Sequence, residues 1–164
     1  MNKETGLKRV FAILILVSLF ASVFIFSTFT LALEIKNDAG TRLFCAPISP
    51  GDEIIYHSTN SIYRVPVEEH LRVESDGALV PVLVISTPDV VYYYGIEAFE
   101  RIDDARVKAI PREARFREVR IKIGRAGPQT LVVRGKTIAL SELMNEGEVV
   151  TLATRESPRA FACW

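Results

Sequence analysis

The chain has 164 residues, of which 20 are Lys or Arg and 20 are Asp or Glu, so its formal net charge at pH 7 is zero. This balance gives no reason to expect a nucleic-acid partner. After the first apolar segment, the remaining length is enough for one domain with a hydrophobic core but too short for two.

The first apolar segment, residues 10–33, contains no charged residue and follows Lys3, Lys8 and Arg9. A membrane-spanning helix needs about 20 apolar residues. Because basic residues precede the segment, the N-terminus is expected to stay in the cytoplasm. We therefore predict a cytoplasmic tail (1–9), a transmembrane anchor (10–33) and an extracytoplasmic domain (34–164) of a single-pass protein of the cell membrane.

The same segment has a second interpretation as a signal segment. Thr30-Leu31-Ala32 ends in the small residue Ala32, after which cleavage would occur. Against this, the apolar region of a signal peptide is usually about 7–15 residues long.

Two cysteines, Cys45 and Cys163, lie in the predicted extracytoplasmic part. Thiol pairs outside the cytoplasm tend to oxidise. We predict a disulfide that ties the C-terminal end to the first strands.

Beyond the anchor, short runs rich in Val, Ile, Tyr and Leu alternate with turns that contain Gly or Pro, which is typical of β-strands. The predicted strands are residues 31–35, 42–46, 53–58, 63–74, 79–86, 90–94, 118–123, 130–134, 137–140 and 148–153. Residues 96–117 are expected to hold a short helix around 99–107 or only a long loop. Residues 140–144 are expected to form one helical turn capped by Ser141. Together these elements predict a small antiparallel β-sandwich or barrel-like domain.

Glu69 interrupts an apolar row of the predicted strand 63–74, because alternate residues share a face with Val67 and Leu71. A carboxylate on such a face needs a partner. We expect His57 or Ser58 of the preceding strand, or a backbone turn, to supply the hydrogen bond. This polar cluster either fixes the register of the hairpin or binds a partner.

Catalysis is not expected here, because Ser58 directly follows His57 and the two side chains point to opposite faces. We predict no enzyme activity, no cofactor and no bound metal.

Tyr92 and Tyr94 share a face if residues 90–94 form a strand. Aromatic rings at a rim can bind a ligand or a partner, and they can also cover a sheet edge. Residues 101–125 carry nine Lys or Arg against four Asp or Glu. This excess is either a solvated face of mixed charge or a docking surface for an anionic lipid or an acidic partner.

From residue 33 to residue 153 the chain resembles the domain of unknown function 1850 family. The resemblance is carried by Pro47–Gly51, Tyr56-His57-Ser58, Val65-Pro66-Val67-Glu68-Glu69, Val73, Asp76-Gly77, Leu131–Lys136, Ile138, Leu140, Leu143 and Gly147–Leu152. The Tyr-His-Ser and Val-Glu-Glu pair is its most specific element. One departure is Val90–Tyr94, where the family has small residues and glycines.

Members of that family are small exported or anchored proteins encoded beside TRAP-type transporters of the TAXI class. The resemblance implies an accessory role next to such a transporter or its solute receptor, with His57, Ser58 and Glu69 as site candidates. We therefore expect a membrane-tethered binding module. The alternative is a small-ligand or metal-binding domain that uses His57, Glu69 and the tyrosine run.

Overall fold

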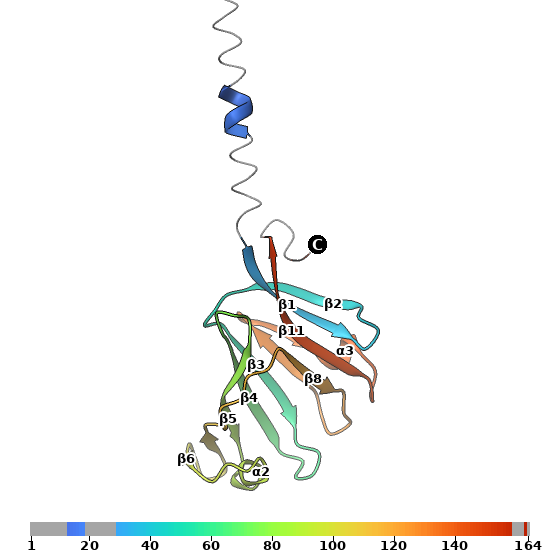
Figure 1. Cartoon of the computed structure of the whole chain (residues 1–164). Helices are drawn as coiled ribbons and strands as arrows, with labels where there is room; N and C mark the ends of the chain where they lie inside the picture. The colour runs from blue at the N-terminus through green and yellow to red at the C-terminus, as the bar shows by residue number, and fades with distance from the viewer. Residues whose placement is uncertain (1–12, 19–28, 159–162, 164) are drawn as a thin grey trace, which may run out of the picture.

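The computed structural model describes residues 13–18, 29–158 and 163, and the described residues beyond 28 form a β domain (Figure 1). The strands are β1 (Phe29–Asn37), β2 (Arg42–Ile48), β3 (Glu53–Thr59), β4 (Pro66–Val73), β5 (Leu79–Ser86), β6 (Phe99–Arg101), β7 (Val107–Ala109), β8 (Glu118–Lys122), β9 (Thr130–Val133), β10 (Lys136–Ala139) and β11 (Val149–Pro158). Two short helices, α2 (Pro88–Tyr93) and α3 (Leu140–Leu143), interrupt them.

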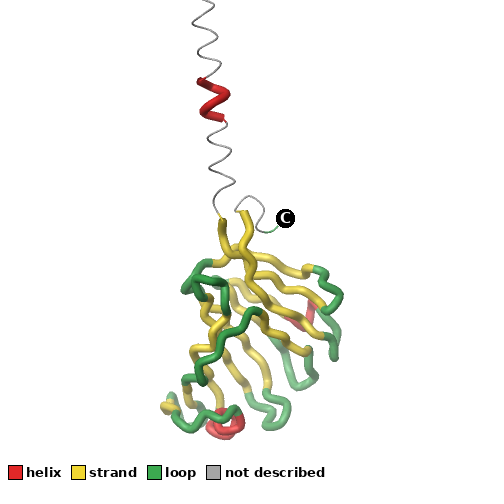
Figure 2. The backbone as a smooth tube through the Cα atoms, in the orientation of Figure 1, coloured by secondary structure: helices red, strands yellow, loops and turns green. Residues whose placement is uncertain are grey.

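The strands form two antiparallel sheets of unequal size. The small sheet has the order β2-β1-β11-β8, and the large sheet has the order β10-β9-β3-β4-β5-β7-β6. Strands dominate both layers, and α2 lies at the end of the domain far from the start of β1 (Figure 2). The predicted mostly β, antiparallel, sandwich-like fold is confirmed.

The inner face of the large sheet is covered by two different parts of the chain. Over most of its area the small sheet covers it, and the side chains between the two sheets form the main core, which includes Leu33, Ile54 and Leu131. At the end of the large sheet formed by β4, β5 and β7, α2 covers the inner face instead. There Val67, Val84, Val90, Val91, Ile96, Val107 and Ala109 form a second cluster, called here the tip core.

The β domain begins earlier than predicted. Phe29–Leu33 belong to β1, and Phe29 pairs with Pro158 of β11. This corrects the predicted boundary at residue 33, because Leu31 and Ala32 are buried in the β domain. Of the rest of the predicted anchor, residues 13–18 are helical and exposed, whereas 10–12 and 19–28 lie outside the described residues. Among the described residues no helix is both long and apolar enough to cross a membrane.

Residues 90–93 belong to α2 and Tyr94 is its C-cap, so the predicted strand over 90–94 is wrong. Pro88 occupies the first turn of α2, where its missing N–H costs nothing. Val90 and Val91 are adjacent and both fully buried, which a helix packed on the tip core allows. Neighbouring residues of a strand would point to opposite faces.

Two further predictions of local structure need correction. The segment 99–107 holds no helix, because β6 and β7 pair with each other around a turn. In that turn the Asp103 side chain accepts hydrogen bonds from the N–H groups of Ala105 and Arg106. The helical turn at 140–144 is present as α3, but its N-cap is Ala139 and not Ser141.

Cys45 of β2 and Cys163 lie at disulfide distance, with 2.12 Å between their sulfur atoms and 5.4 Å between their Cα atoms. The predicted pairing is confirmed. The two cysteines are 118 residues apart, so the disulfide joins the C-terminal end to the small sheet. It stabilises the fold because it reduces the conformational entropy of the unfolded chain.

The position of β1 allows a test of cleavage after Ala32. A domain that starts at Leu33 loses buried Leu31 and Ala32 and four residue pairs with β11. Compared with a domain that starts at Phe29, we expect it to be less stable by about 2–4 kcal/mol and to melt about 5–15 °C lower. Thermal unfolding by circular dichroism measures the difference. Equal melting temperatures would show that the first half of β1 is dispensable.

Candidate functional site

Glu69 lies on the inner face of the large sheet, at the boundary between its two cores. On β4 its same-face neighbours are Leu71, which belongs to the main core, and Val67, which belongs to the tip core. Across the sheet it pairs with Tyr56 of β3 and Val84 of β5. The predicted placement of Glu69 in an apolar row is confirmed. Its carboxylate lies between the part of the large sheet that the small sheet covers and the part that α2 covers.

The hydrogen-bond partner of Glu69 is Tyr94, at the C-terminal end of α2. The Tyr94 hydroxyl donates to the Glu69 carboxylate over 3.0 Å. Burial raises the pKa of Glu69 above its usual range, and the bond from Tyr94 only partly offsets this effect. Burial and the nearby Glu69 carboxylate also raise the pKa of the Tyr94 phenol, so this hydroxyl stays protonated and acts as a donor.

Tyr56 and Gln129 form a second polar pair beside Glu69. The Gln129 side-chain amide donates to the Tyr56 hydroxyl over 2.5 Å and to the main-chain oxygen of Lys122 over 3.1 Å. Its side-chain oxygen accepts a bond from the N–H of Gly124. Gln129 is buried, and it joins the large sheet to the end of β8. No periodic pattern in the sequence points to this residue.

A cavity of about 480 Å³ opens at this point between the two sheets. The large sheet lines it with Tyr56, Glu69, Leu71, Pro81 and Val84, and Tyr94 lies at its edge. Residues 119–122 of β8 line the opposite side. Its volume lies within the range of about 300–1,000 Å³ typical of small-molecule sites.

The segment between β7 and β8, residues 110–117, closes one side of the cavity and is called here the strap. Its Pro111 and Phe116 line the cavity. Phe116 exchanges two main-chain hydrogen bonds with Leu79 at the start of β5. The strap therefore runs from the large sheet to the small sheet across the gap between them (Figure 1).

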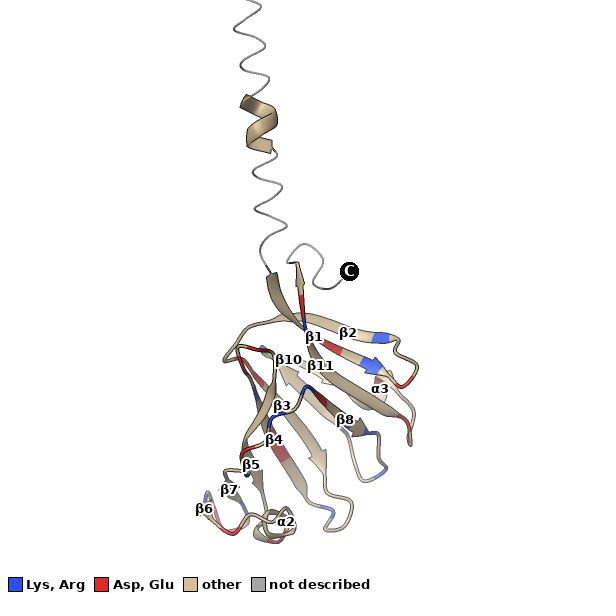
Figure 3. Cartoon of the chain, in the orientation of Figure 1, with Lys and Arg blue, Asp and Glu red and all other residues tan. Residues whose placement is uncertain are grey.

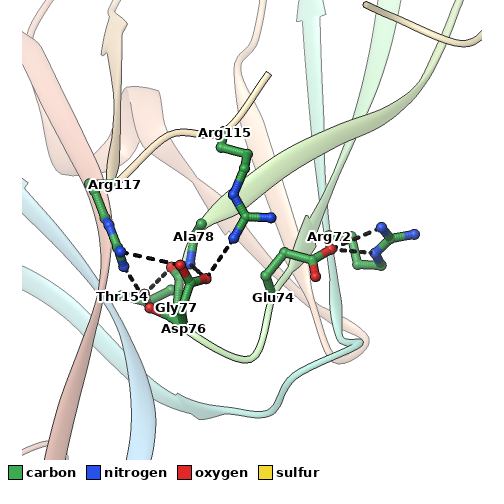
Figure 4. A network of polar contacts seen from close by, with 8 residues as sticks. All are labelled: Arg72, Glu74, Asp76, Gly77, Ala78, Arg115, Arg117 and Thr154. Carbon is green, nitrogen blue, oxygen red and sulfur yellow. Dashed lines mark hydrogen bonds and ion pairs between the residues drawn. The ribbon is translucent and has the colours of Figure 1, made fainter. Parts of the chain in front are cut away.

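Asp76, in the turn between β4 and β5, anchors the strap. Arg115 and Arg117 both reach its carboxylate, over 3.0 and 3.2 Å (Figure 4). The N–H of Ala78, followed by Arg115, holds the pKa of Asp76 below its usual range. The same turn docks on the small sheet, because the Thr154 hydroxyl donates to the Gly77 carbonyl. Gly77 has φ +78°, and a Cβ there would lie 2.5 Å from the Thr154 hydroxyl oxygen, so this contact requires glycine.

The predicted cluster of His57, Ser58 and Glu69 is divided between two faces. Tyr56, not His57, pairs with Glu69, and Ser58 pairs with Val67 on the same face as Tyr56. The expectation that His57 or Ser58 binds Glu69 is therefore wrong. His57 points to the outer face, where its Nδ1 lies 3.6 Å from Glu68.

His70 continues this outer row. Its two ring nitrogens contact Glu68 and Glu53 over 2.7 and 3.1 Å. Burial lowers the pKa of His70, but the bonds to Glu68 and Glu53 outweigh it and raise the pKa above its usual value.

Opposite faces also separate the residues of the predicted metal-binding alternative. His57 and Glu69 do not share a site, and the described part of the chain contains no group of three or more His, Cys, Asp or Glu residues that could hold a metal ion. Of the two candidate tyrosines, Tyr94 lines the cavity, whereas Tyr92 packs edge-on against Phe99 and is exposed.

The basic residues of segment 101–125 are mostly paired with carboxylates. Besides the two contacts to Asp76, these ion pairs are Arg106–Asp103, Lys108–Glu100, Arg120–Asp38 and Arg125–Glu146. Acidic and basic positions are interspersed along the strands and loops (Figure 3). This arrangement favours the solvated face of mixed charge over a docking surface for anions.

Glu34 provides a contrast with Glu69. Its side chain, on the small sheet, is only 3% exposed, and three cations surround it: Lys36 at 2.5 Å, Arg42 at 3.4 Å and Arg155 at 3.5 Å. Burial alone raises the pKa of Glu34, but these cations outweigh burial and lower it. Glu69 has no such cation among the described residues, so its negative charge is unmatched.

A wider groove of about 970 Å³ lies on the outer face of the large sheet. Of its six charged residues, four are in ion pairs: Glu53 with His70, Arg72 with Glu74, and Lys108 with Glu100. Most of the charge in this groove is therefore already paired, unlike the Glu69 carboxylate in the cavity.

Comparisons of the chain with models of protein families, with curated proteins and with solved structures found no match. The family resemblance read from the sequence stays a prediction, and the site stands on its own geometry.

The unmatched charge of Glu69 predicts that Glu69→Gln stabilises the protein at pH 7, by on the order of 1 kcal/mol. A carboxyl whose pKa is raised by folding stabilises the fold below its unfolded pKa, and that contribution is lost as pH rises through its folded pKa. The gain from Glu69→Gln should therefore vanish in acid. Urea unfolding between pH 4 and pH 8 measures it.

The matched control is Glu68→Gln, on the outer face of the same strand. It removes the carboxylate that binds His70, so it should destabilise the protein at neutral pH. If both variants change stability in the same direction, the contrast between the two faces of β4 is wrong.

Proposed function

We propose that the chain is a membrane-tethered, extracytoplasmic binding module whose cavity at Glu69 takes a cationic group. The observation that carries the proposal is a recessed carboxylate that lines a cavity and has a neutral hydroxyl, not a cation, as its hydrogen-bond partner. A carboxylate of this kind is destabilising unless a ligand supplies the missing charge.

The walls of the cavity suit an organic cation. Tyr56, Tyr94 and Phe116 offer aromatic rings, and cations are attracted to the faces of such rings. Leu71 and Val84 supply apolar surface for an alkyl chain. A primary amine or a guanidinium on a short aliphatic chain matches this combination of groups.

The proposed location rests on two features. An apolar stretch without charged residues precedes β1, and it follows basic residues, which favours a single span with the β domain outside. The pair Cys45–Cys163 supports an oxidising compartment. A tethered module meets membrane partners at high effective concentration, so weak binding is sufficient.

The family resemblance suggests a partner for this module. A TRAP-type transporter of the TAXI class, or its solute receptor, remains the proposed neighbour in the membrane. The cavity would then bind a cationic group of the transported solute or of the transport protein.

Calorimetric titration of the full chain in detergent with agmatine, which carries a guanidinium and a primary ammonium on one aliphatic chain, tests the binding of cations. We expect a Kd of about 0.1–10 mM and at least tenfold weaker binding to Glu69→Gln, because the variant removes the negative charge. Glu68→Gln should bind as the wild type does. Binding of benzoate in place of agmatine, or equal binding of agmatine to both variants, would contradict the proposal.

A further inference from the structure

We infer that the cation reaches Glu69 as a Lys or Arg side chain of an extended peptide, which adds as a strand to the free edge of β8. This inference rests on the proposed function, since it names the partner of the same cavity. It depends on three observations: the position of β8, the direction of its main-chain groups and the charge inside the cavity.

β8 is the last strand of the small sheet, and its one strand partner among the described residues is β11. The cavity is lined by four consecutive residues of β8, 119–122. Alternate residues of a strand point to opposite faces, so four in a row can line one cavity only if it runs along the edge of the strand. The free edge of β8 therefore faces the cavity.

The direction of the main-chain groups follows from Ile123. Its N–H donates to Glu148, and its carbonyl accepts from Gly147, so both groups face the β11 side. Because main-chain direction alternates along a strand, the N–H and C=O of Arg120 and of Lys122 face the free edge. The bond from Gln129 to the Lys122 carbonyl agrees with this assignment.

The free edge is bounded at both ends. At one end, the Gln129 side chain donates a hydrogen bond to the Lys122 carbonyl. At the other end, Phe116 is held by two main-chain hydrogen bonds to Leu79. Between them, the main-chain N–H and C=O of Arg120 and the N–H of Lys122 have no partner within the described residues. A strand of about five residues, spanning roughly 17 Å, fits this length.

Strand addition also explains how the cation would reach Glu69. The inward-facing residues of an added strand would project into the cavity beside Val119 and Ile121, towards Glu69 and Leu71 of the facing sheet. The expected ligand therefore has one inward Lys or Arg, with small or apolar residues two positions away on either side. In strand addition, main-chain bonds provide affinity and side-chain pockets provide specificity.

The test uses the full chain in detergent and a labelled seven-residue peptide of alternating alanine and valine with a central lysine. Fluorescence anisotropy should show binding at least tenfold tighter than for the same peptide with its edge-facing main-chain nitrogens methylated. Replacing the lysine by norleucine should weaken binding to a similar extent. Glu69→Gln should weaken binding of the parent peptide at least tenfold.

The protein side of the test compares two variants of one residue. Arg120→Pro removes an edge N–H together with the side chain, and it should bind the peptide at least tenfold more weakly than Arg120→Ala, which removes the side chain alone. Agmatine binding should be the same in these two variants, because they differ in the edge N–H and not in the side chain that lines the cavity. If Arg120→Pro does not fold, the methylated peptide makes the same comparison.

Three results would overturn the inference. Equal affinity of the parent and methylated peptides would show that the side chain alone binds, which leaves the proposed function intact. A dimer of the wild type that Arg120→Pro abolishes would show that a second copy occupies the edge. Peptide binding that does not depend on Glu69 would separate the edge from the cavity. Failure of agmatine to bind would instead refute the proposed function.

Discussion

The unequal size of the two sheets is the constraint on which the rest of this structure depends. Seven strands present one inner face, but the small sheet covers only part of it, and α2 covers the far end. Each cover forms its own hydrophobic core. Between the two cores neither the small sheet nor α2 packs closely on the inner face of the large sheet. A polar residue, Glu69, can therefore lie there beside a cavity. The position of the site follows from this incomplete cover.

Hydrogen bonds and ion pairs between polar side chains connect the elements around the cavity, and they leave the cavity itself open. Gln129 joins Tyr56 to the end of β8, Tyr94 binds Glu69 from α2, and Asp76 holds the strap. These bonds connect the two sheets around the cavity and leave the charge of Glu69 uncompensated. Natural binding sites commonly keep such locally unfavourable groups, because their stabilisation comes with the ligand. Glu34, which is buried among three cations, shows that this chain can match a carboxylate where only stability is needed.

Local patterns predicted much of the fold and the unusual position of Glu69, because period-two alternation decides which face of a strand a residue takes. They did not predict its partner, since Tyr94 comes from a helix 25 residues further along the chain. The error at 90–94 has the same origin: two valines and three tyrosines have high β propensity, but packing on the tip core places residues 90–93 in α2. The anchor boundary failed because an apolar run does not distinguish a membrane helix from a buried strand.

The recessed, unmatched carboxylate of Glu69 is the central claim, and a titration of side-chain carboxyl signals by carbon-13 NMR tests it most directly. Comparison of the wild type with Tyr94→Phe assigns the effect to the Tyr94 hydroxyl. We expect the Glu69 signal to titrate with a pKa above those of exposed glutamates, and to move higher still in Tyr94→Phe, which removes the donated hydrogen bond. A Glu69 signal that titrates with the exposed glutamates, and does not respond to Tyr94→Phe, would contradict the account.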